Sequence, residues 1–177
     1  MRVIALLRGV MPTGKNRIPK MTDLVDILEQ AGFRQVQTYI QSGNVLLETE
    51  LPQAETAQRI HDVILEKLGA DLSVILKTHE QLAAAVRGNP FGDTYDISRI
   101  HLVFTNDVID GAKVAALQGT AFSGEEFVAG SACFYLYLPR SAEKKILNNN
   151  YLERKLGITA TMRKLSVVNH LCEMVVS

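Results

Sequence analysis

A basic segment with two glycines near the start of the chain is the first candidate for chemistry. Residues 8–20 contain four basic side chains and no acidic one, a local charge of +4. Backbone N–H groups at glycine-rich turns ahead of a helix attract anions, and nearby cations add to that attraction. The pattern predicts an anion site, and its alternative is a solvated loop with turn glycines. The residues assigned to this site are Arg8, Gly9, Gly14 and Lys15.

The same segment contains only part of a Walker loop. Gly9 and Gly14 are five positions apart and Lys15 follows, as in that motif. Asn16, however, stands where a Ser or Thr would supply the magnesium-binding hydroxyl. We therefore interpret the match as accidental.

A polar run, Gln41-Ser42-Gly43-Asn44, lies at the tip of an expected hairpin. Such residues commonly do no more than form the turn, and glycine tolerates the positive φ that a tight turn needs. Ser42 would act as a nucleophile only beside a base, and the sequence assigns none. Ligand binding is the role that we retain for Gln41, Ser42 and Asn44. In the expected topology this tip lies near the end of the first strand, where Arg8 stands.

A second basic segment covers residues 140–164, with seven basic and two acidic residues and a local charge of +5. Arginine suits bidentate recognition of phosphate or carboxylate. A solvated helix face, partly neutralised by Glu153, explains the same pattern equally well. The residues assigned to ligand binding here are Lys144, Asn148, Asn149 and Arg163.

The histidines and the aromatic residues indicate no further chemistry. The four histidines lack the spacing of metal ligands, so we predict no metal and no cofactor. Phe134, Tyr135 and Tyr137 lie on one expected strand, as aromatic residues do in RNA-binding sheets. The Lys/Arg-Gly-Phe pattern of that module is missing, so core packing is preferred and nucleic acid is not the favoured ligand.

The elements that position these residues follow from apolar periodicity and from turn residues. Two successive sets each have the order β-α-β-β-α-β. The expected strands cover residues 3–7, 36–40, 45–47, 74–76, 100–104, 125–129, 133–138 and 159–163. The expected helices cover residues 21–31, 57–68, 79–87, 112–118 and 149–156, with a last one from residue 165.

This order predicts an α+β protein of two tandem ferredoxin-like halves with antiparallel sheets, a linking helix and a C-terminal helix. The first and third strands of such a half are central, and the corresponding segments are the most apolar in this chain. The N-terminal half would comprise residues 1–78 and the C-terminal half residues 79–177.

The amino-acid composition of the chain is typical of a globular protein. Of the 177 residues, 47% are hydrophobic and 21% are charged, as in ordinary globular domains. The longest apolar run, around residues 3–7, is too short for a bilayer span or a signal-peptide core. Cys133 and Cys172 form no Cys-x-x-Cys pair, which favours reduced thiols. We therefore expect a cytoplasmic protein without a membrane partner.

Several motifs together resemble a known family. They are Ala5-Leu6-Leu7-Arg8-Gly9-Val10, Gly14-Lys15-Asn16, the run from Thr38 to Val45, Asn89-Pro90-Phe91, the run from Ile146 to Gly157, and Ala160-Thr161-Met162-Arg163. They extend over nearly the whole chain and resemble the bacterial domain of unknown function 1697 family (DUF 1697). The resemblance implies a cytosolic protein with a doubled ferredoxin-like fold and no established activity.

The chain departs from the usual pattern of that family at two places. Met11 and Thr13 stand where the family usually has Asn and Gly, and Lys164-Leu165 replaces Asn-Trp. A function carried by these positions would be changed in this protein.

Together these patterns predict a protein that binds an anionic ligand: a nucleotide, a phosphorylated metabolite or a short nucleic acid. Its site would join residues 8–20, the 41–44 tip and residues 144–163. One alternative is an enzyme that acts on a phosphorylated small molecule, with Lys15 or Ser42 as the reactive group. Another is a scaffold that pairs with other proteins through its sheet edges.

Overall fold

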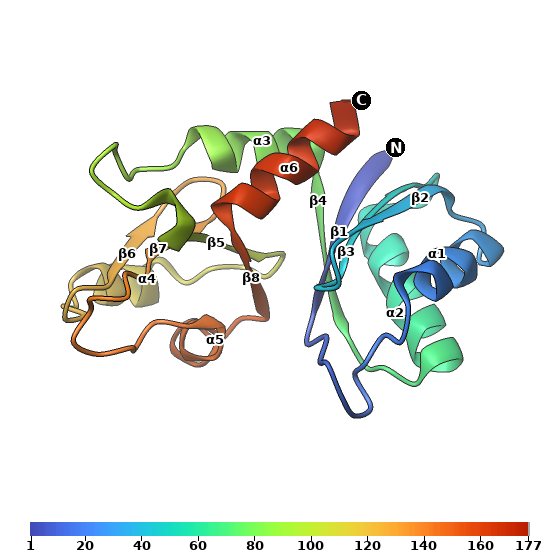
Figure 1. The fold of residues 1–177 in the computed structure, drawn as a ribbon, viewed down its shortest axis with the longest axis horizontal. Coiled ribbons are helices and arrows are strands. Elements are labelled where there is room, and N and C mark those ends of the chain that lie inside the picture. Colours follow the sequence, from blue (N-terminus) through green and yellow to red (C-terminus); the bar gives the residue numbers. More distant parts are fainter. Residues whose placement is uncertain (177) are drawn as a thin grey trace. The chain divides into compact units, whose positions relative to one another are not determined.

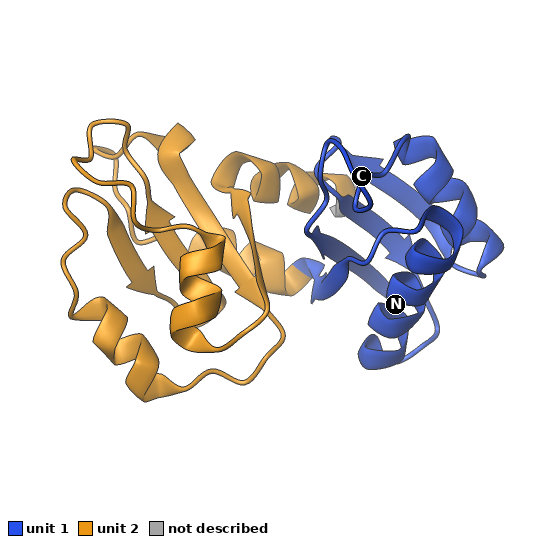
Figure 2. Cartoon of the chain, turned by 90° about the horizontal axis from the view of Figure 1, so that it is seen from below, with its two compact units in different colours: residues 1–79 blue, residues 80–177 orange. Residues whose placement is uncertain are grey.

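A computed structural model describes residues 1–176. The chain divides into two compact units, Met1–His79 and Glu80–Ser177, which Figure 2 shows in different colours. We call them unit 1 and unit 2.

Unit 1 consists of one antiparallel sheet with two helices on one of its faces (Figure 1). Its elements are β1 (Arg2–Arg8), α1 (Met21–Gln30), β2 (Arg34–Tyr39), β3 (Asn44–Glu48), α2 (Gln53–Leu68) and β4 (Ser73–Thr78). The strand order is β2-β3-β1-β4, and all neighbouring strands are antiparallel. The first and third strands are therefore central, as predicted.

The core of unit 1 lies between this sheet and its two helices. Val3, Ala5 and Leu7 alternate along β1, so their buried side chains point to the same face of the sheet. Leu24 and Leu28 are one helical turn apart on α1 and pack into the same core. The apolar periodicity of the sequence thus determines which face of each element is buried.

Unit 2 repeats this order and adds a helix at each end (Figure 1). Its elements are α3 (His79–Arg87), a short 3-10 helix (Ile97–Arg99), β5 (Ile100–Thr105), α4 (Gly111–Gln118), β6 (Glu126–Ala129), β7 (Phe134–Tyr137), α5 (Asn149–Leu156), β8 (Ala160–Lys164) and α6 (Leu165–Val176). The strand order is β6-β7-β5-β8, again with antiparallel neighbours.

The two faces of the sheet in unit 2 carry different helices. On one face, Val103, Phe134 and Leu136 form a core with residues of α4 and α5, including Leu152 and Leu156. The opposite face contacts α6 through β5 and β8. The hydroxyl of Tyr135 in β7 donates to the backbone oxygen of Ala85 at 2.6 Å, which ties α3 to the sheet.

The predicted fold class is confirmed: the protein is α+β, with two β-α-β-β-α-β sets, antiparallel sheets and two additional helices. Every strand lies within two residues of its predicted bounds at each end, and two of the differences have a local cause. The second strand stops at Tyr39, because Ile40 takes a φ of 53°. The strand expected from Glu125 begins at Glu126, because the backbone N–H of Glu125 donates to Phe122 O in a local turn. Within residues 1–176, no helix is both long and apolar enough to cross a bilayer.

Candidate functional site

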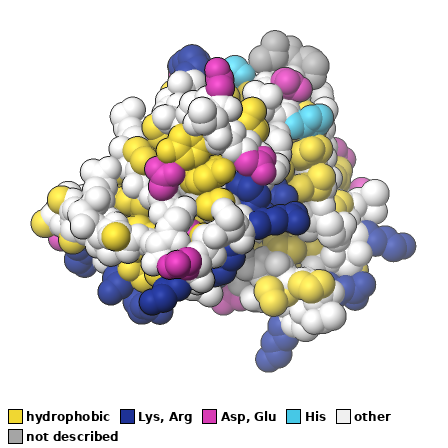
Figure 3. Space-filling view, turned by 60° about the vertical axis from the view of Figure 1, so that its left-hand side comes forward, with side chains coloured by type: hydrophobic (Ala, Val, Ile, Leu, Met, Phe, Trp, Pro, Cys, Tyr) yellow, Lys and Arg dark blue, Asp and Glu magenta, His cyan; other side chains and the backbone are white. Residues whose placement is uncertain are grey.

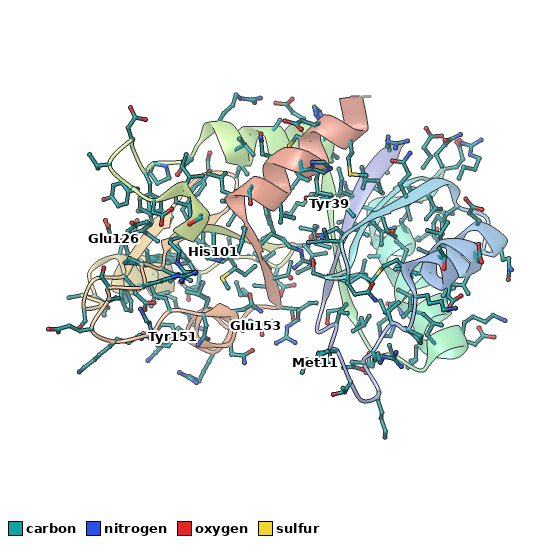
Figure 4. All side chains as sticks on the ribbon, viewed as in Figure 1. Met11, Tyr39, His101, Glu126, Tyr151 and Glu153 are labelled. Atoms are coloured by element: carbon teal, nitrogen blue, oxygen red, sulfur yellow. The ribbon has the colours of Figure 1, made fainter. Side chains whose placement is uncertain are left out.

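A hollow of about 610 Å³ in unit 1 brings together two of the segments that the sequence singled out. One wall is the loop between β1 and α1, which carries Met11 (Figure 4), and the other is the turn between β2 and β3. We call this hollow the loop–turn pocket. Its lining residues are Val10, Met11, Pro12, Arg17, Ile18, Pro19, Ile40, Gln41 and Ser42. Its volume is typical of small-molecule sites.

The turn reaches the loop because Gly43 has no side chain. Gly43 has a φ of 86°, and its backbone oxygen accepts a hydrogen bond of 2.9 Å from the N–H of Leu7. A Cβ atom at this position would lie 2.9 Å from both Leu7 Cβ and Val10 Cγ2. Glycine therefore satisfies both the left-handed backbone and the close approach to β1.

The side chains of Gln41 and Asn44 hold the turn between β2 and β3 in place. The Gln41 side chain donates from Nε2 to the backbone oxygen of Ile18 at 3.0 Å, which fastens the turn to the loop. Asn44 is 0% exposed, and its Nδ2 donates to Tyr39 O and Ser42 Oγ, each at 3.0 Å. The buried amide of Asn44 therefore holds the turn in this structure, and the ligand contact predicted for it stays a prediction.

The cation of the loop–turn pocket is Arg17, which is exposed at the surface. The residues that line the pocket do not include the four that the sequence assigned to the anion site, Arg8, Gly9, Gly14 and Lys15. Arg8 ends β1 and pairs with Ser73 of β4, while Gly14 and Lys15 lie at the exposed tip of the loop. In the sequence, Arg17 contributes to the basic charge of residues 8–20, but nothing there assigns it to the site. The composition of a loop does not indicate which of its side chains line a pocket.

The loop is also held from outside the pocket by a chain of polar contacts. Asn16 accepts from Met11 N through its backbone oxygen at 2.9 Å and from Asp71 N through Oδ1 at 3.0 Å. Asp71 in turn lies 2.7 Å from His61 Nε2, and Asp62 lies 3.0 Å from His61 Nδ1. The hydrogen bond with Asp62, followed by that with Asp71, raises the pKa of His61 above its ordinary value. The spacing of the histidines in the sequence contained no signal for this cluster.

Comparison with known proteins identifies the family. A family model described as "Protein of unknown function (DUF1697)" matches residues 1–135, a range that includes the whole loop–turn pocket. The chain belongs to this family. A solved structure of a conserved bacterial protein from Streptococcus pneumoniae matches with a TM-score of 0.76 over 98% of each chain, at 19% sequence identity. At that identity the likeness shows a shared fold. No curated protein matches the chain.

The third predicted segment of this DUF1697 member belongs to unit 2, where most of its polar side chains bond within the fold. Asn148 caps α5 by accepting from Tyr151 N at 2.8 Å, and Asn149 Nδ2 donates to Ala160 O at 2.8 Å. Lys144 is exposed. Because residues 8–20 and 41–44 belong to unit 1, one site that joins all three segments stays a prediction.

Arg163, another residue predicted to contact a ligand, is largely buried and bonds within the fold, so its ligand contact stays a prediction. It is 8% exposed, and its Nη1 donates to Thr161 Oγ1 at 2.7 Å and to Met162 O at 3.0 Å. Burial lowers the pKa of Arg163 to about 10, so the guanidinium remains charged at neutral pH. In the described part of the chain, no group of three His, Cys, Asp or Glu side chains could hold a metal ion.

Proposed function

We propose that this protein binds a small anionic ligand in the loop–turn pocket. The observation that carries the proposal is that Arg17, Gln41 and Ser42 line the same hollow of about 610 Å³. A guanidinium presents several N–H donors in a planar fork that suits phosphate or carboxylate, and a hydroxyl can add a further bond. The ligand would be a nucleotide or another phosphorylated metabolite.

Binding is favoured over catalysis by the composition of the pocket wall. Of the described residues that line it, none is His, Asp, Glu, Lys or Cys. General acid–base catalysis needs a side chain that titrates near the working pH, and a serine nucleophile needs an adjacent base. Lys15, the other reactive group considered, lies at the exposed loop tip.

We assign each half to the ferredoxin-like fold, supported by the central position of its first and third strands. We assign the protein to the cytoplasm, supported by the two free thiols of Cys133 and Cys172.

A thermal-shift panel of inorganic phosphate, sugar phosphates and nucleotides tests the proposal. A ligand at 100 times its Kd stabilises the folded protein by about 2.7 kcal/mol, which raises Tm by several degrees. Arg17→Ala should weaken binding by about 10- to 100-fold, as expected for the loss of a charged hydrogen bond.

Lys15→Ala is the matched control, because it removes one cation from the same loop outside the pocket. This variant should bind like the wild type at physiological ionic strength. If Lys15→Ala abolished binding while Arg17→Ala did not, the anion site would be the loop tip and the pocket would be the wrong location. The absence of any shift across the panel would contradict anion binding altogether.

A further inference from the structure

We infer that the ligand of the loop–turn pocket is a phosphate ester that carries an aromatic ring, such as a nucleoside monophosphate. This inference rests on the proposed function and narrows it to one class of ligand.

Ile40 occupies a backbone conformation that its side chain disfavours. Its φ is 53°, in the left-handed region where β-branched residues are genuine outliers and where Gly, Asn or Asp is expected. Core packing does not explain the residue, because its side chain remains 47% exposed. Residues held in such strained conformations cluster at ligand sites, where the side chain has a task that the turn itself does not require.

An exposed methionine, Met11, lines the loop–turn pocket from the wall opposite Ile40. Met11 is 53% exposed and lines the loop–turn pocket together with Ile40. Val10, Pro12, Ile18 and Pro19 extend this apolar lining, so Arg17, Gln41 and Ser42 are its polar minority. Exposed apolar side chains that share one concave surface mark a binding site, whereas scattered ones need no explanation.

The pocket wall has a large apolar part and a smaller cationic and polar part. A ligand with both an apolar part and an anionic part would contact both. A bare phosphate or a sugar phosphate would satisfy Arg17 and leave the apolar lining in contact with water. A ring-bearing phosphate ester would place its anion at Arg17 and its ring against Ile40 and Met11, where the thioether also makes favourable contacts with aromatic rings. The pocket therefore favours phosphate esters that carry an aromatic ring, such as AMP, over sugar phosphates that carry none.

Isothermal titration of the full chain with four probes tests this inference: inorganic phosphate, glucose 6-phosphate, AMP and phenyl phosphate. AMP and phenyl phosphate should each bind at least about tenfold more tightly than glucose 6-phosphate. Ile40→Asn should weaken AMP binding by about tenfold and leave phosphate binding unchanged. The same variant should raise Tm by a few degrees, because asparagine tolerates the left-handed conformation.

Ile97→Asn is the matched control, since it removes an exposed isoleucine from unit 2 and should change neither AMP binding nor the preference among probes. Equal binding of glucose 6-phosphate and AMP, or unchanged AMP binding by Ile40→Asn, would overturn the inference while anion binding through Arg17 stood. Tight binding of AMP but not of phenyl phosphate would also overturn it, because recognition would then depend on base hydrogen bonds. If no probe bound, the proposed function itself would fail.

Discussion

At the scale of single residues, Gly43 controls how closely the turn between β2 and β3 approaches β1. Gly43→Ala combines an unfavourable left-handed backbone with overlap against Leu7 and Val10. We expect a loss of about 3 kcal/mol in the free energy of unfolding, measured by urea denaturation. Gly14→Ala is the control, because Gly14 has a φ of 84° but no atom within 4 Å of the added methyl group. It should cost only about 1 kcal/mol, and equal losses would show that the close approach adds nothing.

A second prediction at the scale of single residues is that His61 makes the stability of the folded protein depend on pH. Its pKa in the folded protein lies above the ordinary value of 6.5, mainly through Asp62 and then Asp71. A raised folded-state pKa stabilises the protein fully below the unfolded pKa, and that stabilisation is lost as the pH rises through the folded pKa. His61→Gln should therefore lower Tm relative to the wild type more at pH 5.5 than at pH 8.5.

An NMR titration of the His61 ring checks the cause directly. The midpoint should lie above 6.5 in the wild type and move toward 6.5 in Asp62→Asn, because the largest contribution comes from Asp62. A midpoint that Asp62→Asn leaves unchanged would contradict this assignment.

At the scale of elements, Glu125 organises the segment that leads into α5. Its buried carboxylate accepts from the N–H groups of Ile146 and Leu147 at 2.7 and 2.8 Å through Oε1. Glu125→Ala would leave both donors without this partner, so we expect a loss of about 3 kcal/mol in the free energy of unfolding. Glu143→Ala removes an exposed carboxylate from the same segment and should change stability by less than about 0.5 kcal/mol. Similar losses in the two variants would refute the structural role of Glu125.

At the scale of the whole molecule, the basic and acidic residues balance one another. The chain has 19 basic and 19 acidic residues and a net charge of zero at pH 7. The face seen in Figure 3 accordingly carries both basic and acidic side chains. Proteins without net charge repel one another least, so solubility in polyethylene glycol should be lowest near pH 7 and higher at pH 5 and pH 9. The double variant Asp93→Lys and Glu143→Lys, which changes two exposed positions, should move the minimum to higher pH. A minimum that stays in place would show that local patches rather than net charge govern association.

The sequence by itself determined the elements and their order. The alternation of Val3, Ala5 and Leu7 and the helical spacing of Leu24 and Leu28 identify the buried faces, because periods of two and of about 3.6 residues are properties of the local backbone. The strand order then follows from the apolar character of the first and third strands, and the family follows from motifs that span the chain.

Only the tertiary structure decided which side chains form the pocket. Arg17 lines it while Lys15 stays at the loop tip, and Asn44 and Arg163 are buried although their polarity suggested ligand contact. These outcomes depend on contacts between residues distant in the chain, such as Leu7 with Gly43 and Gln41 with Ile18. A local pattern reports the direction of a side chain relative to its own strand or helix. The direction of a loop residue is set by the long-range hydrogen bonds that hold the loop, and these exist only once the sheet has formed.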